Sequence, residues 1–279
     1  MPLAPTRQIV EAAREAGRGV AAFNVITLEH AEAIVAGAEA AGTPVILQIS
    51  ENAVAYHHGN VFPIALASAA IADGAGVEVS LHLDHVEDQQ LLHRAADAGF
   101  SSVMYDASKL DFADNVAATR DAARWGRTNG LYVEAELGAV GGKGGAHTPG
   151  VRTDPDEAAR FVADTEVDAL AVAVGSSHAM TERTASLDFD LIARIRETVG
   201  VPLVLHGSSG VADTDLQAAV RSGIVKVNIG TILNVAFTNA VRQALTDPSL
   251  VDPRKYLTQA RVDVAAVAER LAATVSSPI

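Results

Sequence analysis

Three histidines of the sequence are placed so that they could share one metal ion. His85, His178 and His206 each stand at or just after the end of a short apolar run that is typical of a β-strand. Neutral imidazole suits zinc, and three protein ligands with one open position define a catalytic zinc site. A lone histidine in such a place is more often an ordinary core or loop residue. Three of them at converging strand ends favour a metal site.

A carboxylate directly precedes the first of these histidines. Asp84 could transfer a proton beside the metal, or it could cap the helix that follows it. Neighbouring residues of an extended strand point to opposite sides. Either the strand ends before His85, or one of the two side chains turns away from the pocket. Spacing alone leaves both questions open.

Two short turns offer backbone N–H groups to an anion. HGSSG (206–210) and NIGT (228–231) each open a predicted helix. Helix N-termini bind phosphate, although the same residues also serve ordinary turns and caps. Both turns follow the last two predicted strands, where α/β barrels commonly bind phosphate. Their position therefore favours a phosphate site.

Eight β-rich runs must position these residues, and an amphipathic stretch follows each run. The runs are 19–25, 44–50, 77–84, 101–106, 131–137, 168–174, 202–207 and 224–230. Alternating strands and helices form parallel sheets, and eight unbroken units predict one (β/α)8 TIM barrel over residues 1–279, with a helical extension at about 252–275. A doubly wound open sheet is the alternative, which the absence of GxGxxG after the first run weakens.

A barrel of this kind gathers polar side chains at one rim, because its active site lies at the C-terminal ends of the strands. The candidates at those ends are Asn24, Ser50, Asp84, Asp106, Glu134, Glu136, His178, His206 and Asn228. We expect them to surround one site, with Asn24 and Ser50 as candidates for substrate contact.

The amino-acid composition excludes several classes of site and partner. The 279 residues are 49% apolar and include no cysteine, which excludes disulfides, thiolate metal sites and a cysteine nucleophile. A formal net charge of −13 argues against nucleic acid or an anionic membrane as a partner. The sequence shows neither a bilayer-spanning run nor a signal-peptide pattern, so we expect a cytoplasmic protein.

Nine segments, taken in order, carry a family resemblance over about residues 3–275. They are AFNV (22–25), LHLDH (81–85), GFSSVMYDAS (99–108), VEAELGAVGG (133–142), TDPDEA (153–158), LAVAVGSSH (170–178), PLVLHGSSG (202–210), KVNIGT (226–231) and DPRKYL (252–257). Together they resemble the class II, zinc-dependent ketose-bisphosphate aldolases, which include fructose- and tagatose-bisphosphate aldolases.

The resemblance implies one catalytic zinc ion per subunit and the residues that serve it. The zinc histidines of the family match His85, His178 and His206. The proton-transferring aspartate of the family matches Asp84. A second, peripheral metal position of some members matches Asp106 and Glu136. The resemblance is also compatible with a bound monovalent cation.

Substrate binding and assembly are implied in the same way. The family's dihydroxyacetone-phosphate loops match Gly207, Ser208, Ser209, Asn228, Ile229, Gly230 and Thr231. Its members are homodimers or homotetramers, and in some of them an arginine of the neighbouring subunit contacts the second phosphate. Arg261 is the candidate for that arginine, and Arg254 is the alternate.

The sequence departs from the family pattern at two places. Ala179 stands where the family has glycine after the second zinc histidine. Lys143 and Gly144 stand where an acidic run is expected, and a glutamate of that run moves the proton at C3 in the family. His147 of the same loop is one candidate replacement, because imidazole titrates near neutrality.

These observations predict reversible retro-aldol cleavage of a phosphorylated ketose to dihydroxyacetone phosphate and an aldehyde. One alternative is a metal-dependent aldolase of another ketose or of a deoxy-sugar acid phosphate. A second is a noncatalytic metabolite-binding protein that kept the fold. Lys226 makes an imine-forming aldolase a formal rival, which the three rim histidines argue against.

Overall fold

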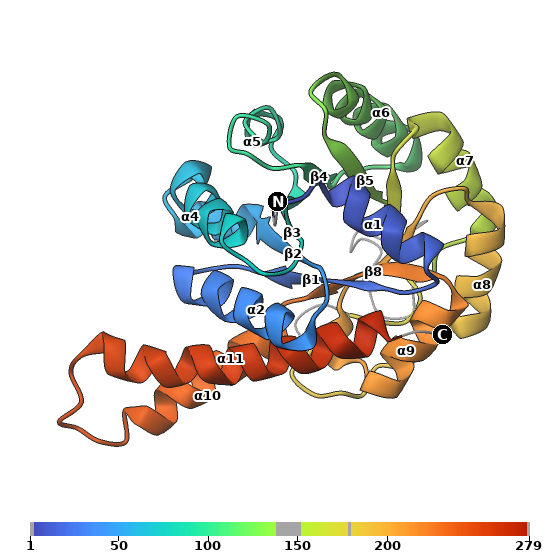
Figure 1. Cartoon of the computed structure of the whole chain (residues 1–279). Coiled ribbons are helices and arrows are strands. Elements are labelled where there is room, and N and C mark those ends of the chain that lie inside the picture. The colour runs from blue at the N-terminus through green and yellow to red at the C-terminus, as the bar shows by residue number, and fades with distance from the viewer. Residues whose placement is uncertain (1–2, 138–151, 178–179, 278–279) are drawn as a thin grey trace.

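A computed structural model describes residues 3–137, 152–177 and 180–277 of the chain. Eight parallel strands close into a barrel in chain order, with β8 paired to β1 (Figure 1). The strands are β1 (Val20–Asn24), β2 (Val45–Ser50), β3 (Val79–Val86), β4 (Ser102–Tyr105), β5 (Tyr132–Glu136), β6 (Ala169–Ala171), β7 (Leu203–Leu205) and β8 (Ile224–Ile229). The predicted (β/α)8 barrel is confirmed.

Helices surround the strands on the outside of the barrel (Figure 1). The described helices are α1 (Thr6–Glu15), α2 (Leu28–Ala41), α3 (Glu51–Tyr56), α4 (Val61–Asp73), α5 (Gln89–Leu92), α6 (Phe112–Thr128), α7 (Pro155–Thr165), α8 (Phe189–Thr198), α9 (Asp213–Ser222), α10 (Thr231–Ala244) and α11 (Pro253–Ser276), with the 3-10 turn η1 (Ser208–Gly210). The main hydrophobic cluster lies between these helices and the strands.

Local sequence explains where the helices begin. Both α7 and α11 start with an Asp–Pro pair, in which proline fits the first helical turn and aspartate accepts from the free N–H groups. Asp154 accepts from the backbone of residues 156 and 157, and Asp252 accepts from Arg254 N. By contrast, the sequence pattern gives no indication of the six-residue helix α3.

The barrel interior is apolar at its N-terminal end. A separate hydrophobic cluster forms this floor, and α1 contributes Ile9 and Val10 to it. The helix lies across that end of the barrel (Figure 1). The hydroxyls of Thr6, its first residue, and Ser102, the first residue of β4, are 2.6 Å apart. The floor closes the barrel, so the opposite end is the open one.

Above the floor the inward side chains become polar. Alternate strand residues face the same side, which places Gln48, His82, Glu134 and Lys226 one layer below the rim. Each of the four is at most 1% exposed. Buried polar groups are stable when hydrogen-bonded. Lys226 donates to Glu134, Gln48 donates to Asp84, and His82 bonds Ser102.

The last two helices form an arm beside the barrel. α10 and α11 pack against each other and extend past the neighbouring helices, with residues 245–252 at the tip (Figure 1). α11 also packs along α2, and it corresponds to the helix predicted at 252–275. None of the helices in the described ranges combines the length and hydropathy that a bilayer span requires.

Candidate active site and metal centre

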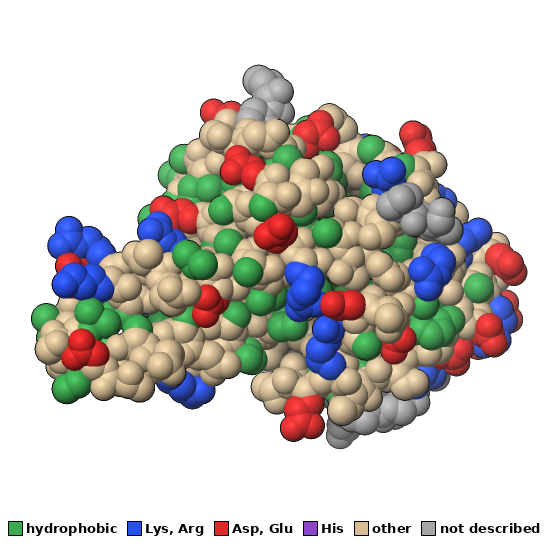
Figure 2. Space-filling view, turned by 60° about the horizontal axis from the view of Figure 1, so that its bottom comes forward, with side chains coloured by type: hydrophobic (Ala, Val, Ile, Leu, Met, Phe, Trp, Pro, Cys, Tyr) green, Lys and Arg blue, Asp and Glu red, His purple; other side chains and the backbone are tan. Residues whose placement is uncertain are grey.

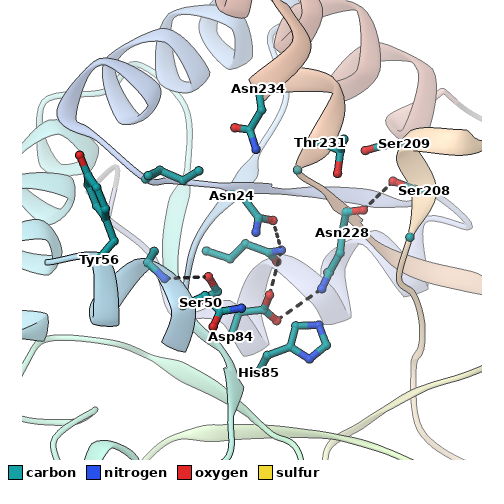
Figure 3. Close-up of a pocket in the computed structure, with 16 residues that line it drawn as sticks. Asn24, Ser50, Tyr56, Asp84, His85, Ser208, Ser209, Asn228, Thr231 and Asn234 are labelled. Atoms are coloured by element: carbon teal, nitrogen blue, oxygen red, sulfur yellow. Dashed lines mark hydrogen bonds between the residues drawn. The ribbon is translucent and has the colours of Figure 1, made fainter. Parts of the chain in front are cut away.

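A cavity of about 360 Å³ opens at the C-terminal ends of the strands (Figure 3). Side chains of β1, β2 and β3 form one wall, and the turns after β7 and β8 form the other. The described lining residues are Asn24, Ile26, Gln48, Ser50, Asn52, Ala53, Tyr56, Asp84, His85, Gly207, Ser208, Ser209, Asn228, Gly230, Thr231 and Asn234. Asp84 and His85 were predicted for the site, and eight of the other lining residues were also candidates, either from the family resemblance or from their place at a strand end.

Asp84 and His85 both face this cavity, although they are neighbours in β3 (Figure 3). The backbone of His85 has a φ of 49°, in the left-handed region. The pairing of β3 with β4 shifts register between Leu83 and Val86, at the same place. This irregularity breaks the alternation of an extended strand and turns the two side chains to one side. Asp88 caps α5, so the interpretation of Asp84 as a helix cap is wrong.

Imidazole and carboxylate groups meet beside Asp84. His85 Nδ1 lies 2.9 Å from Asp106 Oδ2, and the rings of His85 and His206 have centroids 4.8 Å apart. His206 Nδ1 lies 3.3 Å from Glu136 Oε2. Two overlapping groups, Asp84–His85–His206 and His85–Asp106–Glu136, each have their donor atoms within 4.8 Å of one another. The structure thus brings together the predicted metal residues that it describes.

The electrostatics of this cluster favour a cation. Burial acts to lower the pKa of His206, but hydrogen bonds to Glu134 and Glu136 outweigh it and raise the pKa to about 10. Burial likewise opposes the charge on His85, and Asp84 and Asp106 raise its pKa above the ordinary value. A divalent cation would supply the positive charge that these carboxylates attract.

Asp84 itself stays ionised. Burial acts to raise its pKa, but His85, His82 and Lys226 hold the pKa well below its usual range. Gln48 Nε2 donates to one carboxylate oxygen at 3.3 Å, and Asn228 Nδ2 approaches the other at 3.4 Å (Figure 3). The carboxylate is therefore held in place in its charged form.

The two predicted phosphate turns lie next to each other in one wall of the cavity. Gly207 has a φ of 65°, and a Cβ there would lie 2.6 Å from the backbone of Ser177, so the turn needs glycine. Ser208 Oγ donates to Asn228 O at 2.5 Å, and Ser209 Oγ accepts from Ile232 N at 3.2 Å. These bonds join the turn after β7 to the N-terminus of α10.

Two of the predicted substrate residues lie elsewhere. The side chain of Ile229 is 1% exposed and packs in the main hydrophobic cluster. Arg261 pairs with Glu32 of α2 at 2.5 Å and does not line the cavity of its own chain. The alternate, Arg254, pairs with Asp252 at the start of α11. Further predictions fall outside the described residues, namely those for Lys143, Gly144, His147, His178 and Ala179.

Several residues of the site were not predicted. Asn52 and Tyr56 reach the cavity from α3, and Asn234 reaches it from α10 (Figure 3). Gln48 lies two residues before Ser50 on β2, a spacing that puts both on the inward face.

Lys226 is 1% exposed, bonds Glu134 and Asn228, and does not line the cavity. This placement argues against an imine-forming lysine.

A closed (β/α)8 barrel with clustered histidine and carboxylate side chains at its C-terminal rim defines an α/β-barrel enzyme. The chain belongs to the class II fructose-bisphosphate aldolase family, since the family model described as Fructose-bisphosphate aldolase class-II matches residues 4–278. Aldolases are carbon–carbon lyases, and the prediction of a class II aldolase is confirmed.

Named relatives are similar over nearly the whole chain. A fructose-bisphosphate aldolase of Staphylococcus aureus is 37% identical over 265 residues, which cover 94% of this chain and 93% of that protein. One from Geobacillus stearothermophilus is 37% identical over 261 residues, covering 92% and 91%. The crystal structure of the YdjI aldolase from Escherichia coli K12 matches with a TM-score of 0.84 at 32% identity, covering 99% of this chain and 100% of that chain.

Proposed function

We propose that the protein is a zinc-dependent aldolase that reversibly cleaves a phosphorylated ketose to dihydroxyacetone phosphate and an aldehyde. One observation carries this proposal: the Asp84–His85–His206 cluster lies at a cavity whose opposite wall is built from two turns suited to phosphate. A phosphate held at those turns would place the adjacent carbons of the substrate next to the cluster.

The donor set fits zinc. His85 and His206, together with His178 outside the described residues, would hold the catalytic ion, and imidazole is a preferred zinc ligand. Asp106 and Glu136 with His85 would hold a second, peripheral ion. When bound, zinc acts as a Lewis acid that stabilises negative charge developing on substrate oxygens.

The chain's own residues supply binding and proton transfer. Ser208, Ser209 and Thr231 would bind the phosphate of the donor half with backbone N–H groups, and Ser209 and Thr231 would add their hydroxyls. Asp84 would accept the proton of the C4 hydroxyl as the C3–C4 bond breaks, and return it in condensation. Asn228 and Gln48 keep its carboxylate in place.

The end of the cavity away from the phosphate turns is uncharged. Ser50, Asn52 and Tyr56 lie there, and the described lining residues include no lysine or arginine. This favours, as a second candidate, a ketose 1-phosphate whose aldehyde half carries no phosphate. A bisphosphate would need a cation from elsewhere, such as Arg261 of a neighbouring subunit.

A substrate panel with and without chelator tests these proposals. We expect dihydroxyacetone phosphate release from fructose 1-phosphate or from fructose or tagatose 1,6-bisphosphate, measured in a coupled assay. Chelation should abolish the release, and added zinc should restore it. Higher kcat/KM for the monophosphate supports the uncharged subsite. No release from any of the substrates by protein that contains zinc would instead favour the noncatalytic, metabolite-binding alternative.

We also propose that the protein forms homodimers or homotetramers through the α10–α11 arm. Apolar side chains lie among charged ones on the arm (Figure 2). Leu245 is 46% exposed, Val251 83% and Val262 56%. Apolar groups exposed on a projecting two-helix element would give a second copy of the chain a surface on which to pack.

Light scattering of arm variants tests the assembly. We expect Val251→Asp/Val262→Asp to lower the molar mass of the wild-type oligomer, because a charge is costly to bury in an interface. Leu66→Asp is the matched control, since Leu66 on α4 is 59% exposed but lies off the arm. An unchanged mass in the arm variant would place the interface elsewhere.

A further inference from the structure

Lys226 is a buried charge that does not line the cavity. It lies on β8 with 1% exposure, and its Nζ donates to Glu134 Oε2 at 2.8 Å and to Asn228 Oδ1 at 2.7 Å. Apolar residues of similar volume often replace a buried ion pair without loss of stability. The pair in this barrel therefore calls for an explanation beyond stability.

One branch of its contacts leads to a metal-ligand candidate. The other oxygen of Glu134 lies 3.0 Å from His206 Nε2. A carboxylate that is paired with an ammonium group is ionised and can only accept hydrogen bonds. The nitrogen beside its second oxygen must therefore carry the hydrogen. Nε2 of His206 therefore carries a hydrogen, and Nδ1 is the nitrogen that faces Glu136 and the donor cluster. Carboxylates orient metal-binding histidines in this way.

The second branch leads to Asp84. An ammonium group only donates, so the Asn228 atom that faces Lys226 must be the amide oxygen. The amide nitrogen of Asn228 then points to Asp84 Oδ1, at 3.4 Å (Figure 3). The buried ammonium group of Lys226 thus determines the orientation of His206, through Glu134, and of the Asn228 amide.

We propose that Lys226 is a positioning residue that holds His206 through Glu134 and Asp84 through Asn228. The proposal deepens the proposed function and rests on it for the roles of His206 and Asp84. Lys226 does not line the cavity, so it acts on the site only through Glu134 and Asn228. Its effect is to fix one ring nitrogen toward the donor cluster and one carboxylate toward the cavity.

Lys226→Met keeps the length of the side chain and removes the ammonium group. We expect the dissociation constant for zinc to rise by up to ~10–100-fold, which is the usual effect of losing the direct partner of a metal ligand, here Glu134. The value of kcat should fall more than KM rises, since phosphate binding at the turns is untouched. Zinc affinity is measured by competition with a chromophoric chelator, which needs no substrate. Arg194→Met, at an exposed arginine of α8 that lies off both the cavity and the α10–α11 arm, is the matched control and should behave as wild type.

The double variant Lys226→Met/Glu134→Gln separates positioning from simple charge balance. It leaves no unpaired buried charge, so we expect Tm to return toward the wild-type value. Nothing then directs Asn228 toward Asp84, so kcat should stay low. The variant also serves if Lys226→Met alone does not fold.

Two results would overturn the proposal. One is wild-type zinc affinity in folded Lys226→Met protein, and the other is recovery of kcat together with Tm in the double variant. If the wild type cleaves no ketose phosphate, the proposed function fails, and the zinc affinities still decide whether Lys226 positions His206.

Discussion

Replacing Asp84 with alanine should slow carbon–carbon cleavage by ~10²–10⁴-fold, which is the usual contribution of a positioned acid–base group. The carboxylate lies in the cavity wall, stays ionised and is held by Gln48 and Asn228. Zinc content should remain near that of the wild type if the histidines carry the ion. The coupled cleavage assay and metal analysis of the same preparation measure the two quantities.

Asp84→Asn is the matched control for shape, because it keeps the volume and removes the charge. It should lose cleavage to a similar extent. Exchange of the C3 proton of dihydroxyacetone phosphate with solvent should persist in both variants, since that step does not involve the C4 hydroxyl. A loss of less than tenfold in cleavage would remove Asp84 from the chemistry.

Substitution of His206 by alanine should deplete the metal and abolish turnover. The ring is fully buried between Glu134 and Glu136, and it joins Asp84 and His85 in the donor cluster. The loss of zinc affinity should exceed the ~10–100-fold that a partner of a metal ligand contributes. Zinc per subunit after gel filtration, measured by mass spectrometry, checks this expectation.

The alanine variant also leaves two buried carboxylates without their imidazole partner, a change that costs about 3–5 kcal/mol of stability. Circular dichroism must therefore show that the barrel has formed. His206→Gln retains a hydrogen-bond donor for Glu134 and serves if the alanine variant unfolds. Retention of both zinc and activity in a folded variant would show that the metal site is misplaced.

The barrel rim could be predicted because strand ends can be recognised one by one. Asp84, Asp106, Glu136 and Asn228 each follow or end an apolar run, and parallel strands bring such ends together. The layer beneath follows from the same rule. His82, two residues before Asp84, and Lys226, two before Asn228, share the inward face with them.

Other features depend on tertiary structure and could not be predicted. The left-handed backbone of His85 is one, since histidine adopts it rarely and no glycine or proline marks the place. The short helix α3 is another, because six residues are too few to form a helix without packing. The positions of Asn52 and Tyr56 in the cavity wall follow from that helix.

The apolar floor beneath α1 and the buried polar layer above it respond differently to substitution. Substitutions among aliphatic residues of the floor change volume and packing, and hence the melting temperature of the protein. In the buried polar layer above, a single substitution of Glu134 or Lys226 leaves a hydrogen-bonding partner unsatisfied. Packing at the floor can therefore be changed without touching the cavity, which lies at the opposite end of the barrel.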